Sequence, residues 1–558
     1  MHRRKPFSVK QKKKQLQEKR KRKKERKDRC DDETENRRAE TAAAAATAVR
    51  LDSQTSSGEE ESEVKEDIRI HEQPRAKQKQ HDPNRYRLHF EQQSAAEIAQ
   101  RKREAREPII HLPPECLEVC LEDVYQPGSV LDFPKRPLWD YSMTKRQVEE
   151  REEQMFSKYF KGIRDQYRPD QLSWFEKNLE TWRQLWRVLE MSDVILLITD
   201  IRHPVLHFPP ALYDYVVNDA KKKLVLILNK VDLVHRGLVI AWKLYFESKF
   251  PELHIVCFSS FPTGDPTVTS RATKGLLSKP KKRTGKASGG NAILAAIRDL
   301  HLDKGNLDEW EVKLAEGDPF EYRQQEEDAG GARKKDSLLT IGLVGHPNVG
   351  KSSVINGLIG KKVVSCSRTP GHTKHFQTIY LTPTVCLCDC PGLVFPSLVD
   401  KNLQILSGLF PVSQVQEPYS PVGYLAARIP LVEILGIRRE EGDVSDPDRP
   451  MSAWEICFYW AEKRGYYTAR AARPDAYRAA NSLLRLTIEG RLCMAMRPPG
   501  YAKDTPAKDH VSVAEQLIDR DETESDESSS EDDVSEEEAD EALTNRYALL
   551  GNAPSEMI

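Results

Sequence analysis

The segment Gly345–Ser352 (GHPNVGKS) constrains the fold most, because it lies between an apolar run, Leu338–Val344, and a helical pattern that starts at Ser353. It matches G-x-x-x-x-G-K-[ST], a pattern that is informative where a strand precedes it and a helix follows. Its glycines allow a tight turn in which consecutive backbone N–H groups surround phosphate oxygens at a helix N-terminus. The segment therefore predicts a phosphate-binding loop in an α/β fold.

Other short apolar runs favour a mostly parallel sheet, because strands covered on both faces consist almost entirely of apolar residues. These runs are Val194–Asp200, Leu224–Leu228, Ile255–Phe258 and Val385–Cys388. Helical patterns separate them, and the strongest, over 172–191, carries one apolar stripe. The stripe consists of Phe175, Leu179, Trp182, Trp186 and Leu189. The runs are far shorter than the ~18 apolar residues of a membrane span, so we expect no membrane partner.

The phosphate loop predicts which side chains would bind a nucleotide and its metal ion. Lys351 would reach the β- and γ-phosphates, and the Ser352 hydroxyl would bind Mg²⁺. Further along, Asp389-Cys-Pro-Gly392 follows an apolar run, so Asp389 can hold Mg²⁺ through water and the Gly392 N–H can contact a γ-phosphate. The nucleotide contacts expected from the loop are Gly345, Pro347, Asn348, Val349, Gly350, Lys351, Ser352 and Ser353.

Polar residues around these motifs carry weaker signals. Thr373 lies between the two motifs and could give Mg²⁺ a second hydroxyl ligand, with Thr369 as the competing candidate. Three histidines, His346, His372 and His375, are close to the motifs in sequence but have no obvious catalytic partner, so packing within loops is the favoured interpretation.

A second motif, Asn229-Lys230-Val-Asp232, follows the apolar run Leu224–Leu228 and predicts base recognition. A carboxylate at Asp232 can accept hydrogen bonds from N1–H and the 2-amino group of guanine, and adenine offers neither pattern. Ser259 and Ser260 follow another apolar run and could donate backbone N–H groups to the guanine O6. Beside a phosphate loop, this motif indicates guanine nucleotides, GTP and GDP.

The order of the motifs is unusual. In an ordinary small GTPase the phosphate loop comes first, whereas here base recognition at 229–260 precedes phosphate binding at 345–392. An α/β sheet tolerates circular permutation because its natural termini lie close together. The segment 261–337 would then join the former termini. The fold class predicted is therefore α/β, a circularly permuted P-loop GTPase domain with a mostly parallel sheet.

These residues resemble the circularly permuted GTPases of the YlqF/YawG type over about residues 80–500. The resemblance rests on Asp200-Ile-Arg202-His-Pro204, whose D-x-R-x-P form is typical of that family, on the tryptophan-rich helix before it and on Ser367–Thr373. It implies GTP hydrolysis with Mg²⁺ and, in many relatives, work on ribosomal subunit assembly. It also implies a potassium-coordinating asparagine in the phosphate loop, which here would be Asn348. The catalytic set expected is Lys351, Thr373 and Asn348.

The residue after Gly392 is Leu393, where many GTPases carry a glutamine that orients water. Because leucine cannot polarise water, we expect a GTPase with a slow intrinsic rate. Two interpretations stay open at this point. One is a GTP/GDP switch acting on RNA or pre-ribosomal particles, and the other is a nucleotide-gated protein scaffold in signalling with negligible hydrolysis.

Composition divides the chain into parts. We expect a disordered N-terminal region at 1–80, an N-terminal extension at 81–170 and the GTPase domain at 171–396, with an insertion or linker at 262–336. A helical domain at 397–502 and a disordered acidic tail at 503–558 would follow. Cys386, Cys388 and Cys390 form C-x-C-x-C, which we interpret as core strand cysteines, since tetrahedral zinc sites prefer C-x₂₋₄-C pairs.

The chain is nearly neutral, with 86 Lys/Arg against 87 Asp/Glu, but its ends are strongly polarised. Residues 1–30 contain 16 Lys/Arg and 3 Asp/Glu, which favours RNA binding and recognition by a nuclear import receptor. Residues 519–541 contain 14 Asp/Glu, and the tail's Ser525, Ser528–Ser530 and Ser535 are candidate phosphorylation sites. We therefore expect a nuclear or nucleolar phosphoprotein, with exchange into the cytoplasm left open.

Overall fold

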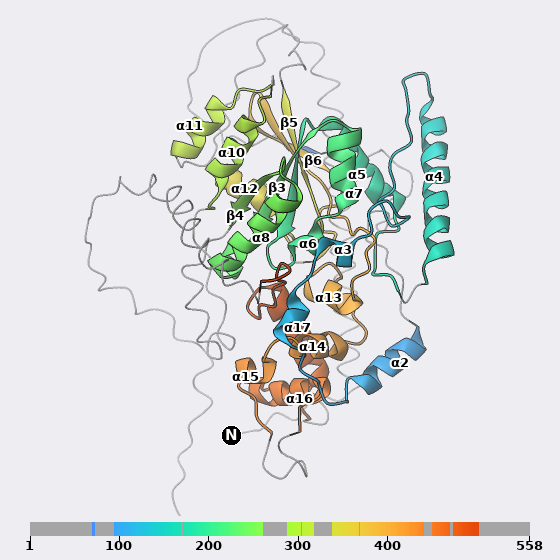
Figure 1. The fold of residues 1–558 in the computed structure, drawn as a ribbon, viewed down its shortest axis with the longest axis vertical. Coiled ribbons are helices and arrows are strands. Elements are labelled where there is room, and N and C mark those ends of the chain that lie inside the picture. The colour runs from blue at the N-terminus through green and yellow to red at the C-terminus, as the bar shows by residue number, and fades with distance from the viewer. Residues whose placement is uncertain are drawn as a thin grey trace, which may run out of the picture. The chain divides into compact units, whose positions relative to one another are not determined.

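Figure 1 shows the computed structural model, which describes residues 70–72, 94–168, 171–260, 287–302, 304–316, 338–367, 369–439, 449–468 and 473–501. The basic run of residues 1–30 and the tail 503–558 lie outside the described residues, as does most of the predicted disordered region 1–80. Three residues of that region, Ile70–Glu72, form strand β1. The prediction of disorder throughout 1–80 is therefore wrong at this point, because a three-residue edge strand has no periodicity that a sequence could reveal.

A seven-stranded sheet organises the molecule, in the order β1-β6-β7-β5-β2-β3-β4. Its remaining strands are β2 (Val194–Asp200), β3 (Lys223–Asn229), β4 (His254–Phe258), β5 (Leu339–Val344), β6 (Gln377–Thr382) and β7 (Val385–Asp389). Strands β7, β5, β2, β3 and β4 are parallel, and β6 and β1 extend the sheet antiparallel. The predicted strands and the mostly parallel sheet are confirmed. Strand β6 was missed, because its polar and apolar residues mix in a hairpin arm.

Two apolar layers cover the sheet, and successive residues of β2 contribute to opposite layers. One layer contains Ile195 and Leu197 with the helices α5 (Leu179–Met191), α7 (Pro210–Asp214) and α8 (Arg236–Lys249). The other contains Val194 and Leu196 with α10 (Gly290–Asp299), α11 (Asp308–Glu316) and α12 (Lys351–Ile359). Figure 1 shows α10, α11 and α12 on the left of the sheet and α5 and α7 on its right.

Two predicted boundaries change. Helix α5 begins at Leu179 rather than at 172, because the Asn178 side chain accepts a hydrogen bond from the Glu180 N–H and caps the helix there. The predicted insertion or linker at 262–336 contains α10 and α11, whose Ile293, Ile297 and Trp310 are completely buried in the second layer. That interpretation therefore missed two helices, because the polar stretches on either side dominated the composition.

The predicted helical region after the sheet contains α13 (Lys401–Leu406), α14 (Tyr419–Ala426), α15 (Leu431–Leu435), α16 (Ala453–Arg464) and α17 (Ala476–Ile488). Helix α16 shows how the sequence sets these boundaries. Ser452 and Glu455 form a capping box at its start, and Gly465 ends it with a φ of 64°.

The N-terminal extension contributes α2 (Ala95–Glu104), α3 (Leu121–Val124) and α4 (Lys145–Gln166). The short helix α6 (Pro204–His207) follows β2. Main-chain hydrogen bonds tie the extension to the helical region: the Trp454 N–H donates to the Ala105 carbonyl and the Val119 N–H to the Arg497 carbonyl. Within the described ranges, no helix is both long and apolar enough to cross a membrane.

Candidate functional site

The predicted motifs meet at the carboxyl edge of the parallel strands. Asp200 pairs in register with Asn229, and Leu343 pairs with Asp389, so the loops after β2, β3, β5 and β7 leave the sheet side by side. Strand β5 lies between β7 and β2, which places the phosphate loop at the centre of this edge. Ligands of open parallel sheets bind at this position, so the fold brings together segments separated by more than 100 residues.

The phosphate loop connects β5 to the first turn of α12 as predicted. Lys351 is buried, and its ammonium donates hydrogen bonds to the carbonyls of Gly345 (3.0 Å) and His346 (2.7 Å). Burial lowers the pKa of Lys351, and the Asp389 carboxylate opposes this effect. Gly350 has a φ of +106°, and a Cβ there would collide with the Asn229 amide. The loop conformation therefore requires glycine where the base-recognition motif approaches it.

Ser352 and Asp389 fit a magnesium ion. The Ser352 hydroxyl donates to Asp389 Oδ2 over 2.8 Å, while the buried Asp389 Oδ1 has no hydrogen-bond partner. Burial raises the pKa of Asp389, whereas Lys351 and Ser352 lower it. A buried carboxylate oxygen without a partner, next to a hydroxyl, is the oxygen-rich environment that Mg²⁺ prefers.

A pocket lies beside the loop, and its walls include Asn348, Lys351, Ser352, Ser353 and Gly392. A Cβ on Gly392 would come within 2.7 Å of Pro347 Cα and 3.1 Å of Lys351 Nζ, so the Asp389–Gly392 segment packs directly on the loop. Thr369 and Thr373 both line this pocket. The structure therefore places both threonines near the predicted metal ligands, and both stay candidates for the second hydroxyl ligand of Mg²⁺.

The base-recognition motif lies on the other side of the loop. The Asn229 amide donates to the Val349 carbonyl over 2.8 Å. The Ser259 hydroxyl donates to Asp232 Oδ1 over 2.7 Å, which orients the carboxylate, and the enclosed Ser260 Oγ has no partner. The structure therefore brings Ser259 beside Asp232, but the Ser259 backbone N–H, predicted to reach the guanine O6, donates instead to the Ser288 carbonyl over 3.1 Å. The role predicted for the Ser260 N–H stays a prediction.

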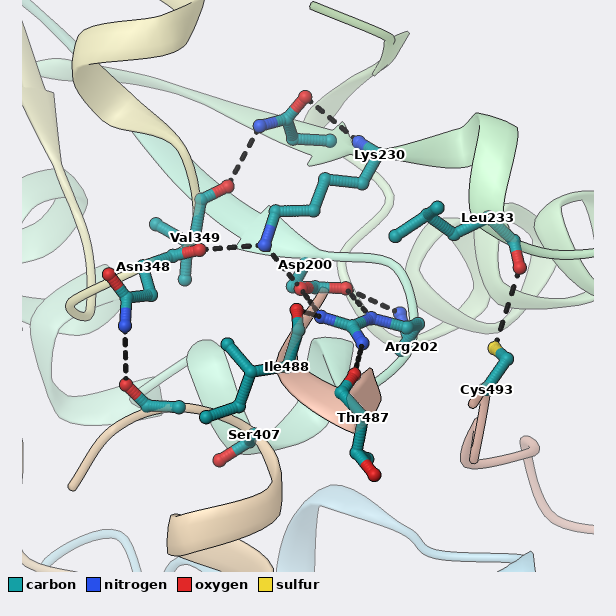
Figure 2. Close-up of polar contacts among 12 residues, drawn as sticks. Asp200, Arg202, Lys230, Leu233, Asn348, Val349, Ser407, Thr487, Ile488 and Cys493 are labelled. Atoms are coloured by element: carbon teal, nitrogen blue, oxygen red, sulfur yellow. Dashed lines mark hydrogen bonds and ion pairs between the residues drawn. The ribbon is translucent and has the colours of Figure 1, made fainter. Parts of the chain in front are cut away.

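Lys230 joins the two motifs. Its ammonium donates to the Asn348 carbonyl over 2.7 Å and to Asp200 Oδ2 over 2.8 Å, as Figure 2 shows. Burial alone would raise the pKa of Asp200, but the Arg202 and Lys230 cations beside it hold that pKa well below its usual value. Asp200 and Arg202 were absent from the predicted site. The signal that could have found them is the D-x-R-x-P segment itself, because it begins at the end of β2, next to the strand that carries Asn229.

Asn348 lines the phosphate pocket, and its side chain also contacts the helical region. Its amide nitrogen donates to the Gly408 carbonyl, 2.8 Å away, at the end of α13, and its backbone has a φ of +60°. The potassium-binding role implied for Asn348 stays a prediction.

The histidines and cysteines near the site differ in burial. His346 is buried, with its ring centroid 5.3 Å from those of His207 and Phe395, so loop packing is confirmed for it. His372 is exposed. Cys386, Cys388 and Cys390 are all buried, as expected for core cysteines, and burial raises the pKa of Cys390 to about 12. Such thiols stay protonated at neutral pH.

Comparison with known proteins gives matches to one family model, to curated relatives and to solved structures. Residues 340–414 match a family described as 50S ribosome-binding GTPase. Guanine nucleotide-binding protein-like 1 of Rattus norvegicus is 50% identical over 550 residues, which cover 93% of this chain and 89% of that protein. Large subunit GTPase 1 of Saccharomyces cerevisiae is 34% identical over 392 residues, or 67% of this chain and 59% of that protein. A structure of GNP-bound YlqF from T. maritima aligns with a TM-score of 0.34 and 18% identity, covering 57% of this chain and 98% of that chain.

Proposed function

The chain belongs to the guanine nucleotide-binding protein-like 1 family of GTPases, and from this premise we propose that it is a GTP/GDP switch in the assembly of ribosomal particles. The single observation that carries the nucleotide assignment is the contact between Lys230 and the Asn348 carbonyl. This contact supports the proposal, because it joins residues 229–232 to the loop 345–352 and would let one nucleotide occupy both.

Binding would use groups already in position. Asp232, oriented by Ser259, would accept hydrogen bonds from guanine N1–H and the 2-amino group, and adenine would leave this carboxylate unpaired. Lys351 would exchange its bonds to the loop carbonyls for phosphate oxygens, together with the loop N–H groups.

The metal site would use the chain's own oxygen atoms. Ser352, Asp389 and one of the two threonines would hold Mg²⁺, which when bound neutralises charge that develops on the phosphates. Since Asp389–Gly392 packs against Pro347, loss of the γ-phosphate would change the position of this segment, which leads into the helical region.

Hydrolysis would be slow without help. The Leu393 side chain is buried in the core, and its N–H donates to the Gly345 carbonyl over 3.3 Å. It offers no polar atom to an attacking water, so a potassium ion held with the help of Asn348, or a partner, would have to supply the missing stabilisation.

The large ribosomal subunit is the particle on which we propose that the switch acts. Support comes from the names of the matching family and of the yeast relative, and from the basic N-terminal run, which suits RNA phosphates and a nuclear import receptor. The site of action would then be the nucleus or nucleolus, and serines of the acidic tail would be phosphorylated.

The test compares the full wild-type chain with Lys351→Ala in cells and in solution. Expected are GTP-dependent cosedimentation of the wild type with large-subunit particles, crosslinks to RNA, and loss of the nucleotide dependence in the variant. Capture of proteins alone after nuclease treatment, with no measurable hydrolysis, would instead identify a nucleotide-gated scaffold.

A further inference from the structure

A buried arginine connects the nucleotide site to the helical region. Arg202 is 1% exposed and lies two residues after the end of β2. Its guanidinium donates through Nε to Asp200 Oδ1 over 3.0 Å and through Nη2 to Asp200 Oδ2 over 2.7 Å. This paired geometry is the strong form of an arginine–carboxylate contact.

The opposite edge of the guanidinium faces the end of α17. Nη1 donates to the Thr487 carbonyl over 2.8 Å, and Nη2 approaches the Ile488 carbonyl at 3.4 Å. Carbonyls at a helix C-terminus carry partial negative charge, so a buried cation stabilises them, and the Thr487 carbonyl accepts from the Gly490 N–H as well as from Arg202. The main chain reinforces the contact, because the Met496 N–H donates to the Arg202 carbonyl over 2.8 Å.

The carboxylate between them has a second cation. Asp200 Oδ2 also accepts from Lys230, whose ammonium reaches the Asn348 carbonyl in the phosphate loop. Contacts therefore run without interruption from α17 through Arg202, Asp200 and Lys230 to the loop, as the dashed lines of Figure 2 show. If Arg202 only stabilised the fold, its carboxylate partner would not need to hold a lysine of the guanine-recognition motif.

Two further contacts join the same partners. The Asn348 amide donates to the Gly408 carbonyl, and a Cβ on Gly408 would lie 3.3 Å from the Ile488 side chain. On the base side, the Cys493 thiol donates to the Leu233 carbonyl over 3.4 Å. The phosphate loop thus contacts Gly408, which lies beside Ile488 at the end of α17, and the base-recognition segment contacts Cys493, five residues after that end.

We propose that Arg202 is a positioning residue that couples guanine-nucleotide affinity to the docking of α17, by holding the Asp200 carboxylate that orients Lys230. This inference rests on the proposed nucleotide binding. Because coupling between two binding events is reciprocal, bound nucleotide strengthens the docking of α17, and a ligand that displaces α17 weakens nucleotide binding by the same factor.

The experiment uses the full chain and fluorescent GDP, with Arg202→Gln, Arg202→Lys and the control Arg183→Gln. Arg183 is a matched control because its guanidinium is also nearly buried and bonded to carboxylates, those of Glu152 and Glu180. It belongs to α5, and these ion pairs involve neither α17 nor the predicted nucleotide motifs. Two quantities are measured: the GDP dissociation rate, and hydrogen exchange of residues 483–496 with and without GDP.

In the wild type, GDP is expected to slow exchange at 483–496. Arg202→Gln should raise the dissociation rate at least tenfold and abolish this protection. Arg202→Lys keeps the charge beside Asp200 but lacks the planar fork, so it should restore part of the slow dissociation and little of the protection. Arg183→Gln should lower the melting temperature without changing either quantity.

Dissociation within twofold of wild type and retained protection in Arg202→Gln would overturn the proposal, as would an equal effect of Arg183→Gln. If Arg202→Gln does not fold, the same two measurements on Arg202→Lys decide, and wild-type values there overturn the coupling. Failure of the wild type to bind GDP at all would instead refute the proposed function.

Discussion

The carbonyl oxygen of Asn348 accepts a 2.7 Å hydrogen bond from the ammonium of Lys230, a residue 118 positions earlier in the chain. The contact joins the base-recognition motif to the phosphate loop, two motifs that follow each other along this chain in the opposite order to that of ordinary small GTPases. It shows that permuting the chain leaves the neighbourhood of phosphate and base recognition intact, because the sheet register and not the chain order places β3 and β5.

Asp232→Asn is expected to exchange the base specificity of the site. An amide cannot accept from both guanine donors, so GTP affinity should fall by about 100-fold. The affinity for xanthosine triphosphate, which has an acceptor at position two, should rise. Competition binding with both nucleotides measures this. Lys351→Ala is the control, since it should weaken both triphosphates alike; wild-type GTP affinity in Asp232→Asn would refute the assignment of 229–232.

Asp389→Asn should raise the Mg²⁺ concentration needed for half-maximal GTP hydrolysis by about 10- to 100-fold, because it removes a charged ligand partner while keeping the side-chain shape. A titration with Mg²⁺ at saturating GTP gives the value. Asp193→Asn is the matched control, since Asp193 pairs with Lys304 before β2 and away from Ser352. An unchanged midpoint in Asp389→Asn would remove Asp389 from the metal site.

Potassium should accelerate hydrolysis relative to sodium if Asn348 turns its side chain oxygen toward a monovalent cation. The expected increase comes from added positive charge near the phosphates, which Leu393 cannot supply. Hydrolysis rates in the two chloride salts at equal ionic strength test it. Asn348→Ala should make the two rates equal, and equal rates already in the wild type would contradict this role.

The stability of the fold should decrease below about pH 6.5. Burial lowers the pKa of His203 and His207 to about 3. The unfolded chain then takes up protons between pH 6.5 and 3 that the folded chain does not, so the free energy of unfolding is fully retained above this range. It falls by about 1 kcal/mol per pH unit for each ring as the pH drops.

Urea denaturation at pH 7.5, 6.5 and 5.5 measures this slope. His207→Gln should reduce it, whereas His111→Gln, at an exposed histidine, should leave it unchanged. Equal stability of the wild type at the three pH values would mean that these rings are protonated in the folded state.

Deletion of residues 1–30 should reduce nuclear accumulation and flatten the salt dependence of RNA binding. Each Lys or Arg that neutralises a phosphate releases a counterion, so removing 16 of them lowers the slope of affinity against salt. Imaging of the tagged chain and titration with structured RNA at several salt concentrations test both parts. GTP affinity serves as the control and should not change.

The sequence predicted the elements whose signals are local. Gly345–Ser352 identified its own strand and helix, and Asp232 was assigned to guanine, because phosphate and base recognition need particular residue types at fixed spacing. The apolar run Val194–Ile198 identified a buried strand for the same reason. By contrast, β6 and α10 were missed, since neighbouring polar segments concealed patterns that become decisive only when they pack on β7 and β4.

From the sequence alone, the chain order of the motifs and their residue types determined a permuted GTPase with a phosphate loop. Only the tertiary structure decided that Arg202 meets the carbonyls of Thr487 and Ile488, the first of them 285 residues away. A main-chain carbonyl is the same in every residue, so nothing in the side chains at 487 and 488 could announce this contact. The position of α17 beside the residues that follow β2 created it, through the packing of a helix whose buried face includes Leu483, Leu484 and Leu486.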